Sequence, residues 1–119
     1  MSTARTRSGR TRTLDPPQYS MLRAMLEEQR RFRTDQIAHA SPSDGTRNGR
    51  PPTDADREVT SAILRAARIA LHDIEAALTR MDNGTYGKCV DCGRRLPTER
   101  LEVLPQAAQC MDCQRAAAR

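Results

Sequence analysis

Residues 89–113 read CVDCGRRLPTERLEVLPQAAQCMDC and contain two Cys-x-x-Cys pairs. The pairs are Cys89 with Cys92 and Cys110 with Cys113, separated by 17 residues. A Cys-x-x-Cys turn directs two thiolates at one ion, and two such turns at this separation are typical of a four-cysteine zinc site. Gly93 follows the first pair and relaxes the backbone of that turn. The sequence therefore predicts one zinc ion held by all four cysteines.

The predicted zinc is structural rather than catalytic. Four thiolates fill its tetrahedral coordination sphere, which leaves no position for water or substrate. A redox pair or two disulfides would be the alternative use of four cysteines, and a reducing compartment disfavours it. Near the two histidines, His39 and His72, the sequence indicates no nucleophile or set of carboxylates that could form an active site. We therefore expect no enzymatic activity.

The composition leaves little material for a conventional globular core. Hydrophobic residues make up 37% of the 119 residues, with one Phe, two Tyr and no Trp, and the mean hydropathy is −0.75. A chain with so little apolar surface needs a further source of stability, and a structural metal is one. Neither a secretory signal nor a run of roughly 20 apolar residues is evident. We expect a soluble, cytoplasmic protein that does not enter membranes.

Two segments before the cysteines have the pattern of amphipathic helices. The first runs from residue 16 to about 40 after an N-cap at Asp15, and the second runs from 54 to 81 after a cap at Thr53 or Asp54. Apolar residues recur in steps of three and four along both, as in helices that bury one face. They are Tyr19, Leu22, Met25, Leu26, Phe32 and Ile37 in the first segment, and Val59, Ile63, Ala66, Ala70, Ile74, Ala77 and Met81 in the second, where Leu64, Ala67, Leu71 and Leu78 widen the stripe.

The loop between these segments predicts how they pair. Residues 41–53 are rich in Ser, Pro, Gly, Asn and Asp, the composition of an exposed turn. Each helix needs an apolar partner, and the nearest is the other one, so we predict an antiparallel hairpin. The expected chain is mainly α: a two-helix coiled-coil hairpin over 15–83 with its tip loop at 41–53, then a four-cysteine zinc finger with a short C-terminal helix over 84–119. We expect a monomer, with a self-associating coiled coil as the alternative.

The formal net charge of +5 is concentrated at the N-terminus. Residues 1–14 include four arginines and no acidic residue: Arg5, Arg7, Arg10 and Arg12. A segment without apolar anchors does not order itself, so we expect a disordered basic tail, with an organelle transit peptide as the alternative. Basic tails contact phosphate backbones without sequence preference. Together with the basic residues around the finger, Lys88, Arg94, Arg95 and Arg100, the tail suggests an alternative function, a nucleic-acid-binding zinc-finger protein. An interaction module stabilised by zinc is a third possibility.

Further residues around the cysteines form a longer pattern. It comprises Gly84-Thr85-Tyr86-Gly87-x-Cys89-x-x-Cys92-Gly93, Leu96-Pro97-x-x-Arg100-Leu101-x-x-x-Pro105 and Cys110-x-x-Cys113-Gln114. This pattern over residues 84–114 resembles the zinc-finger signature of the DksA/TraR family. The helical hairpin predicted before it agrees with the family in order and placement.

The resemblance implies a function that composition and spacing do not. Members of the family are bacterial transcription regulators that bind RNA polymerase directly instead of reading promoter DNA. They insert the hairpin into the secondary channel of the polymerase, often together with the alarmone ppGpp, and so modulate initiation. Acidic residues at the hairpin tip approach the catalytic region of the polymerase.

The resemblance also indicates which residues could act at the tip. The tip of active family members carries a sequence similar to Asp-x-x-Asp-x-Ala. The nearest stretch in this sequence is SPSDGT at residues 41–46. On that alignment Asp44 is kept, while Ser41 and Thr46 replace the first acid and the alanine. A second acidic cluster, Asp54 and Asp56, lies at the start of the second helix. The candidate tip residues are therefore Asp44, Asp54 and Asp56.

Overall fold

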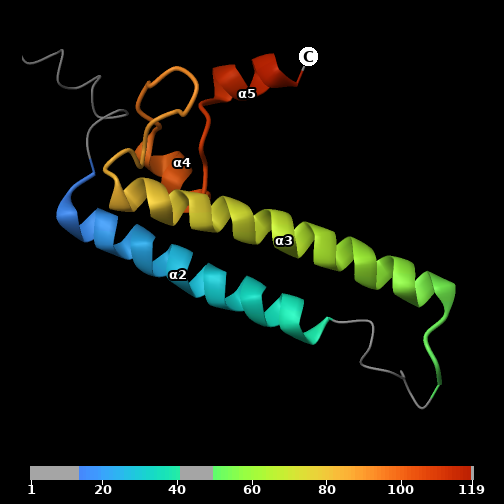
Figure 1. Ribbon diagram of the computed structural model, residues 1–119. Coiled ribbons are helices and arrows are strands. Elements are labelled where there is room, and N and C mark those ends of the chain that lie inside the picture. The colour runs from blue at the N-terminus through green and yellow to red at the C-terminus, as the bar shows by residue number, and fades with distance from the viewer. Residues whose placement is uncertain (1–13, 41–49, 119) are drawn as a thin grey trace, which may run out of the picture.

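The computed structural model describes residues 14–40 and 50–118, which form helices joined by irregular segments (Figure 1). The helices are α2 (Pro16–His39), α3 (Asp54–Asp82), α4 (Thr98–Val103) and α5 (Met111–Ala117). No β-strand occurs in these ranges, although Lys88 and Arg95 form one isolated antiparallel bridge. The mainly helical class predicted from the sequence is confirmed. All of the predicted tail except Leu14, and most of the tip loop including Asp44, lie outside the described residues.

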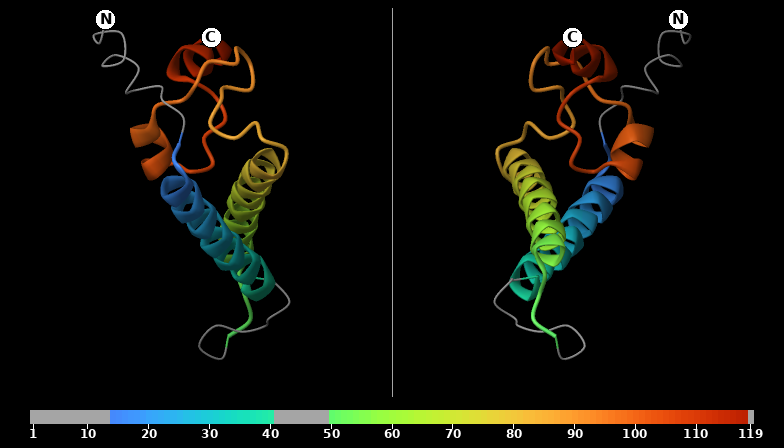
Figure 2. Two further views of the ribbon diagram at one scale, coloured as in Figure 1. Left: turned by 90° about the vertical axis from the view of Figure 1, so that its left-hand side faces the viewer. Right: turned by 90° about the vertical axis from the view of Figure 1, so that its right-hand side faces the viewer.

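The two long helices, α2 and α3, run antiparallel and form a rod. Their 24 and 29 residues correspond to lengths of about 36 and 43 Å. The finger segments and α4 lie over one end of the rod, and the end of α2 and the start of α3 lie at the other (Figures 1 and 2). The radius of gyration is 18.8 Å, whereas a compact chain of similar length would have about 13 Å. The molecule is therefore elongated, with its finger and its tip at opposite ends.

Both long helices begin with a capping box. The carboxylate of Asp15 accepts the main-chain N–H of Gln18 at 2.9 Å, and the Gln18 side chain accepts the N–H of Asp15 at 3.1 Å. Thr53 and Asp56 repeat this arrangement at 3.1 and 2.9 Å, so Thr53 is the N-cap of α3. Each cap satisfies main-chain donors that a helix end leaves unpaired and contributes about 1 kcal/mol.

The apolar core lies at the base of the rod and includes residues of the finger. Its buried members come from α2 (Leu22 and Leu26), from α3 (Ile74, Ala77, Leu78 and Met81) and from the finger (Tyr86, Cys89, Leu96, Leu101 and Cys110). Gly84, just beyond α3, adopts a φ of +80° and turns the chain back over this core. The helices and the finger therefore share one core.

The half of the rod nearer the tip is packed less fully than the apolar pattern predicts. Phe32, Val59 and Ile63 are 60%, 58% and 41% exposed. The α2 face that begins with Leu22 and Leu26 continues, in steps of three and four, through polar residues: Gln29, Arg33 and Gln36. Opposite them, α3 still buries Leu64 and Ala67. The polar face of α2 offers no apolar partner to the remaining residues of the α3 stripe, so these stay in solvent.

No helix in the described ranges combines the length and the apolar content needed to span a membrane.

Packing at the base predicts where truncation is costly. Leu26→Ala removes a side chain with 0% exposure and should lower the free energy of unfolding by about 3 kcal/mol, because a cavity remains. The matched change Phe32→Ala on the same helix should cost less than about 0.5 kcal/mol, because that ring is mainly in solvent. Urea unfolding followed by circular dichroism measures both. Equal losses for the two variants would show that the core extends along the rod.

Candidate metal centre

The first cysteine pair lies in a tight turn after α3. The main-chain N–H of Cys89 donates to the carbonyl of Arg94 at 2.8 Å, and that of Gly93 donates to the carbonyl of Cys89 at 2.9 Å. Gly93 adopts a φ of +78°, a conformation in which a side chain would be strained, as the sequence predicts. The second pair begins α5, because Cys110 is its N-cap. A turn and a helix start therefore bring the two pairs together.

The four sulfur atoms form a group with the dimensions of a zinc site. They all lie within 4.8 Å of one another, and the Sγ atoms of Cys92 and Cys110 are 3.8 Å apart. A tetrahedral site with Zn–S bonds of about 2.3 Å has sulfur–sulfur distances of about 3.8 Å. Cys89, Cys92, Cys110 and Cys113 thus fit one zinc ion. Since all four ligands come from the protein, the ion would be structural.

Main-chain N–H groups point at the sulfurs and favour thiolates. The N–H of Asp91 donates to Sγ of Cys89, and that of Cys113 to Sγ of Cys110, both at 3.4 Å. Hydrogen bonds from main-chain N–H groups, that of Cys110 foremost, lower the pKa of Cys89 to about 6. Hydrogen bonds with Cys110 and Cys89 raise the pKa of Cys113 instead. Four close thiols cannot all ionise without a cation between them, which is the role zinc would fill.

Three contacts outside the sulfur group join the two cysteine pairs. The N–H of Val90 donates to the carbonyl of Ala108 at 2.8 Å. The side chain of Gln109 donates to the carboxylate of Asp91, and Arg94 forms an ion pair with Asp112 at 3.2 Å. The sequence prediction missed these side-chain contacts. A signal was available, because each pair has aspartate directly before its second cysteine.

Two tyrosines connect the finger to the rod. The hydroxyl of Tyr86 donates to the carbonyl of Pro105, and that of Tyr19 donates to the carbonyl of Met81, both at 2.8 Å. Their rings meet edge to face, with centroids 6.0 Å apart. Burial raises the pKa of Tyr86 to about 12, so its hydroxyl keeps its proton and remains a donor near neutral pH. Tyr86 thus ties the finger to the start of α2 through Tyr19.

The three arginines predicted as phosphate contacts do not gather on one surface. Arg94 is paired with Asp112, and Arg100 donates to the side chain of Gln114 at 2.8 Å. Arg100 and Arg95 line different cavities.

Of the three candidate tip residues, Asp44 lies outside the described residues. The other two lie in the first turn of α3. There Asp54 pairs with Arg57 at 3.0 Å, and Asp56 closes the capping box with Thr53.

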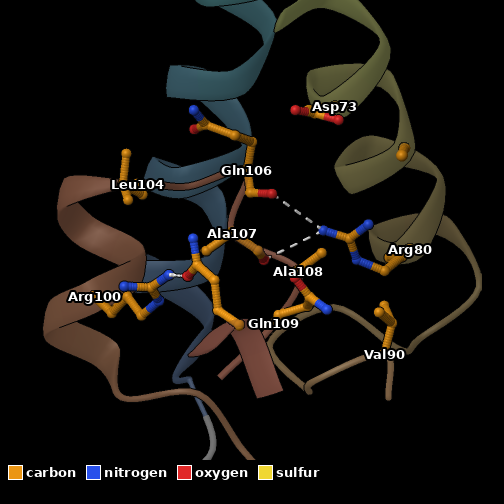
Figure 3. A pocket seen from close by; sticks show the side chains of 11 residues that line it. Asp73, Arg80, Val90, Arg100, Leu104, Gln106, Ala107, Ala108 and Gln109 are labelled. Carbon is orange, nitrogen blue, oxygen red and sulfur yellow. Dashed lines mark hydrogen bonds between the residues drawn. The ribbon is translucent and has the colours of Figure 1, made fainter. Parts of the chain in front are cut away.

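A cavity of about 410 Å³ lies between α3 and the finger (Figure 3). Arg80 reaches across it and donates to the carbonyls of Gln106 and Ala107 at 3.5 and 3.3 Å. Burial lowers the pKa of Arg80, whereas nearby Tyr86 and Asp73 act in the opposite direction. Arg80 and Arg100 each keep a buried Nε that has no hydrogen-bond partner within the described structure. Two guanidinium groups therefore line the cavity, although their unpaired Nε atoms are buried.

Known proteins match this chain at the finger and in the overall fold. The prokaryotic dksA/traR C4-type zinc finger family matches residues 84–118. The finger of this chain is therefore similar to that of the DksA/TraR family. General stress protein 16O of Bacillus subtilis is 36% identical over 59 residues, and RNA polymerase-binding transcription factor DksA of Haemophilus influenzae is 39% identical over 46. These matches cover 50% and 39% of this chain, but the chain spans only 36% and 32% of the two proteins.

The fold as a whole resembles a solved DksA structure. Transcription factor DksA2 from Pseudomonas aeruginosa superposes with a TM-score of 0.70 at 22% sequence identity. The match covers 87% of this chain and 85% of DksA2. The rod and the DksA/TraR finger therefore follow the DksA2 architecture, and one structural zinc agrees with both the finger family and the sulfur geometry.

The contacts outside the DksA/TraR sulfur group should strengthen zinc retention. Asp112→Asn removes the ion pair with Arg94, which holds the two cysteine pairs together, and should weaken zinc binding about tenfold. Competition with a coloured chelator measures the affinity. Asp82→Asn, which breaks an ion pair with Arg23 on the rod, is the matched control and should leave zinc binding unchanged. Cys113→Ser should release the ion. Unchanged affinity in Asp112→Asn would show that the sulfurs alone determine retention.

Proposed function

We propose that this chain is a bacterial transcription regulator of the DksA kind that binds RNA polymerase directly. The observation that carries the proposal is the combination of a DksA/TraR finger with a rod that follows DksA2 over 87% of the chain. One relative is named as an RNA polymerase-binding transcription factor. In this proposal the protein acts in the cytoplasm as a monomer and performs no chemistry of its own.

The proposed mechanism uses the rod to carry the tip into the secondary channel. A pair of helices about 40 Å long is narrow and stiff, and can place a few side chains at a distance from the surface that holds it. In this proposal residues 15–83 form the rod that enters the channel, with the tip at 41–53. The finger over 84–119 holds the base of the rod. A carboxylate at the tip, Asp44, then acts by electrostatics in a confined, partly desolvated site.

The nucleic-acid alternative has less support. A phosphate-binding surface needs cations gathered on one face. Arg94 and Arg100 instead pair with groups of the finger itself, which leaves Lys88 and Arg95 as two adjacent cations at a different cavity from Arg100. The basic tail at residues 1–14 remains the main feature in favour of that alternative.

A substitution at Asp44 should change the effect of the protein on transcription without changing its affinity for polymerase. Asp44→Asn keeps the size of the side chain but removes its charge, so polymerase affinity should stay within about threefold, because rod and finger supply the contacts. The effect on transcription should disappear. Binding is measured with purified core RNA polymerase after nuclease treatment, and output by transcription in vitro. Absence of polymerase binding by the unaltered chain would contradict the proposed function.

The matched controls for Asp44 lie in the first turn of α3. Asp54→Asn and Asp56→Asn remove the same charge, but those carboxylates pair with Arg57 and complete the cap at Thr53. They should lower stability by about 1 kcal/mol or less and leave the output in place. If either control abolished the output while Asp44→Asn did not, the acidic cluster at the helix start would be the working element.

We also propose the cavity in Figure 3 as the place where ppGpp acts on this chain. Phosphate groups favour guanidinium donors, and Arg80 and Arg100 both line this cavity. Asp73 lines the same cavity and opposes a bound anion. The alarmone would therefore bind beside one unfavourable charge. Removing an arginine should weaken ppGpp binding, and removing the charge of Asp73 should strengthen it.

Two substitutions at the cavity should shift the ppGpp response in opposite directions. Arg100→Gln should raise the ppGpp concentration needed for half of the effect by about tenfold, and Asp73→Asn should lower it. The measurement is transcription in vitro with polymerase, the chain and increasing ppGpp. Arg68→Gln, an exposed arginine on α3 that lines neither cavity, is the control. If neither substitution changed the ppGpp concentration needed for half of the effect, ppGpp would act at another site.

A further inference from the structure

Two cations stand side by side at the end of the molecule opposite the tip. Lys88 and Arg95 form the isolated antiparallel bridge, so their side chains leave the same face of the finger. Like charges directly opposite each other are destabilising. Neither side chain has an ion pair or a hydrogen bond to any other residue that the structure describes. The repulsion is therefore not offset by a contact within the described chain.

Both cations line a cavity of about 220 Å³ between the start of α2 and the finger. Leu14, Leu96 and Leu101 contribute to its wall, but Leu96 and Leu101 are only 2% and 1% exposed, so little apolar surface is open to a ligand. The rings of Tyr19 and Tyr86 complete the wall, but both hydroxyl protons are already donated to main-chain carbonyls. Lys88 and Arg95 are thus the charged donors of this cavity. Such a site suits a group with a negative charge.

We propose that this cavity receives an acidic segment of RNA polymerase. In this contact an Asp or Glu carboxylate of that segment meets Lys88 and Arg95. The inference rests on the proposed function and extends it. A hairpin that enters the channel tip first leaves this end at the outer surface of the polymerase, where a protruding segment could reach the cavity.

Charge and ring packing disfavour two other occupants. The basic tail of this chain joins the described structure at Leu14, but its four arginines have the same sign as the two cations. Nucleic-acid bases need an open aromatic face on which to stack. Tyr86 is only 7% exposed and has its ring against Tyr19, so it does not offer one. An acidic protein segment remains the occupant that fits.

Charge reversal tests the contact. Lys88→Glu with Arg95→Glu should weaken binding to core RNA polymerase about tenfold, mainly through a slower association rate, and should reduce its salt dependence. Lys88→Gln with Arg95→Gln should weaken binding less and raise the melting temperature, because the repulsion is gone. Arg5→Glu with Arg7→Glu, in the N-terminal tail to which the proposed function gives no polymerase contact, makes the same change in net charge and should weaken binding less than the reversal at the cavity.

Every variant is first shown to hold one zinc per chain, since Lys88 adjoins Cys89. Full-strength polymerase binding by the Lys88→Glu, Arg95→Glu variant would overturn the inference and leave the proposed function intact. An equal loss in the control pair would also overturn it, because net charge alone would explain the effect. If the Lys88→Glu, Arg95→Glu variant lost binding to a 20-nucleotide single-stranded DNA but still bound polymerase as the unaltered chain does, the two cations would be assigned to nucleic-acid binding instead. Failure of the unaltered chain to bind polymerase would remove the proposed function and this contact together.

Discussion

The apolar core at the base of the rod supports the rest of the structure. It gathers the buried leucines of α2, the last turns of α3 and the finger residues around Cys89 and Cys110 into one cluster. A chain with 37% hydrophobic residues cannot build several such clusters, so rod and finger depend on the same one. Two zinc ligands are members of the cluster. Metal binding therefore stabilises the surface that closes the base of the rod as well as the finger itself.

The two ends of the rod differ in how they are held together. At the base, Tyr19 and Arg23 link α2 to the end of α3 through the carbonyl of Met81 and the carboxylate of Asp82. Toward the tip, the contact face of α2 becomes polar and leaves Val59 and Ile63 exposed. Fewer buried apolar contacts mean lower local stability, so opening of the hairpin should begin at the tip end. In the proposed function that end is the part that enters the channel.

Five cations in and beside the finger divide into three groups with different consequences. Arg94 stabilises the finger by joining its two cysteine pairs through Asp112. Arg80 and Arg100 line the cavity between α3 and the finger and donate to groups of the finger. Lys88 and Arg95 face each other across the isolated bridge, where they repel, and have no acidic partner in the described structure. A single count of positive charge would treat these groups as equivalent, although they differ in the partners that they already have.

The sequence by itself determined the zinc ligands, the helical hairpin and its caps, because these depend on local spacing. Cysteines two residues apart form a turn whatever the rest of the chain does, and Asp15 caps the helix that directly follows it. The sequence prediction missed α4, the contact between Asp91 and Gln109, and the exposure of Phe32 and Val59. Only the tertiary structure decided these features, because they depend on which surfaces far apart in the chain meet. Periodicity shows that a helix has an apolar face, but the length of that face that becomes buried depends on the partner helix, and here the partner is polar.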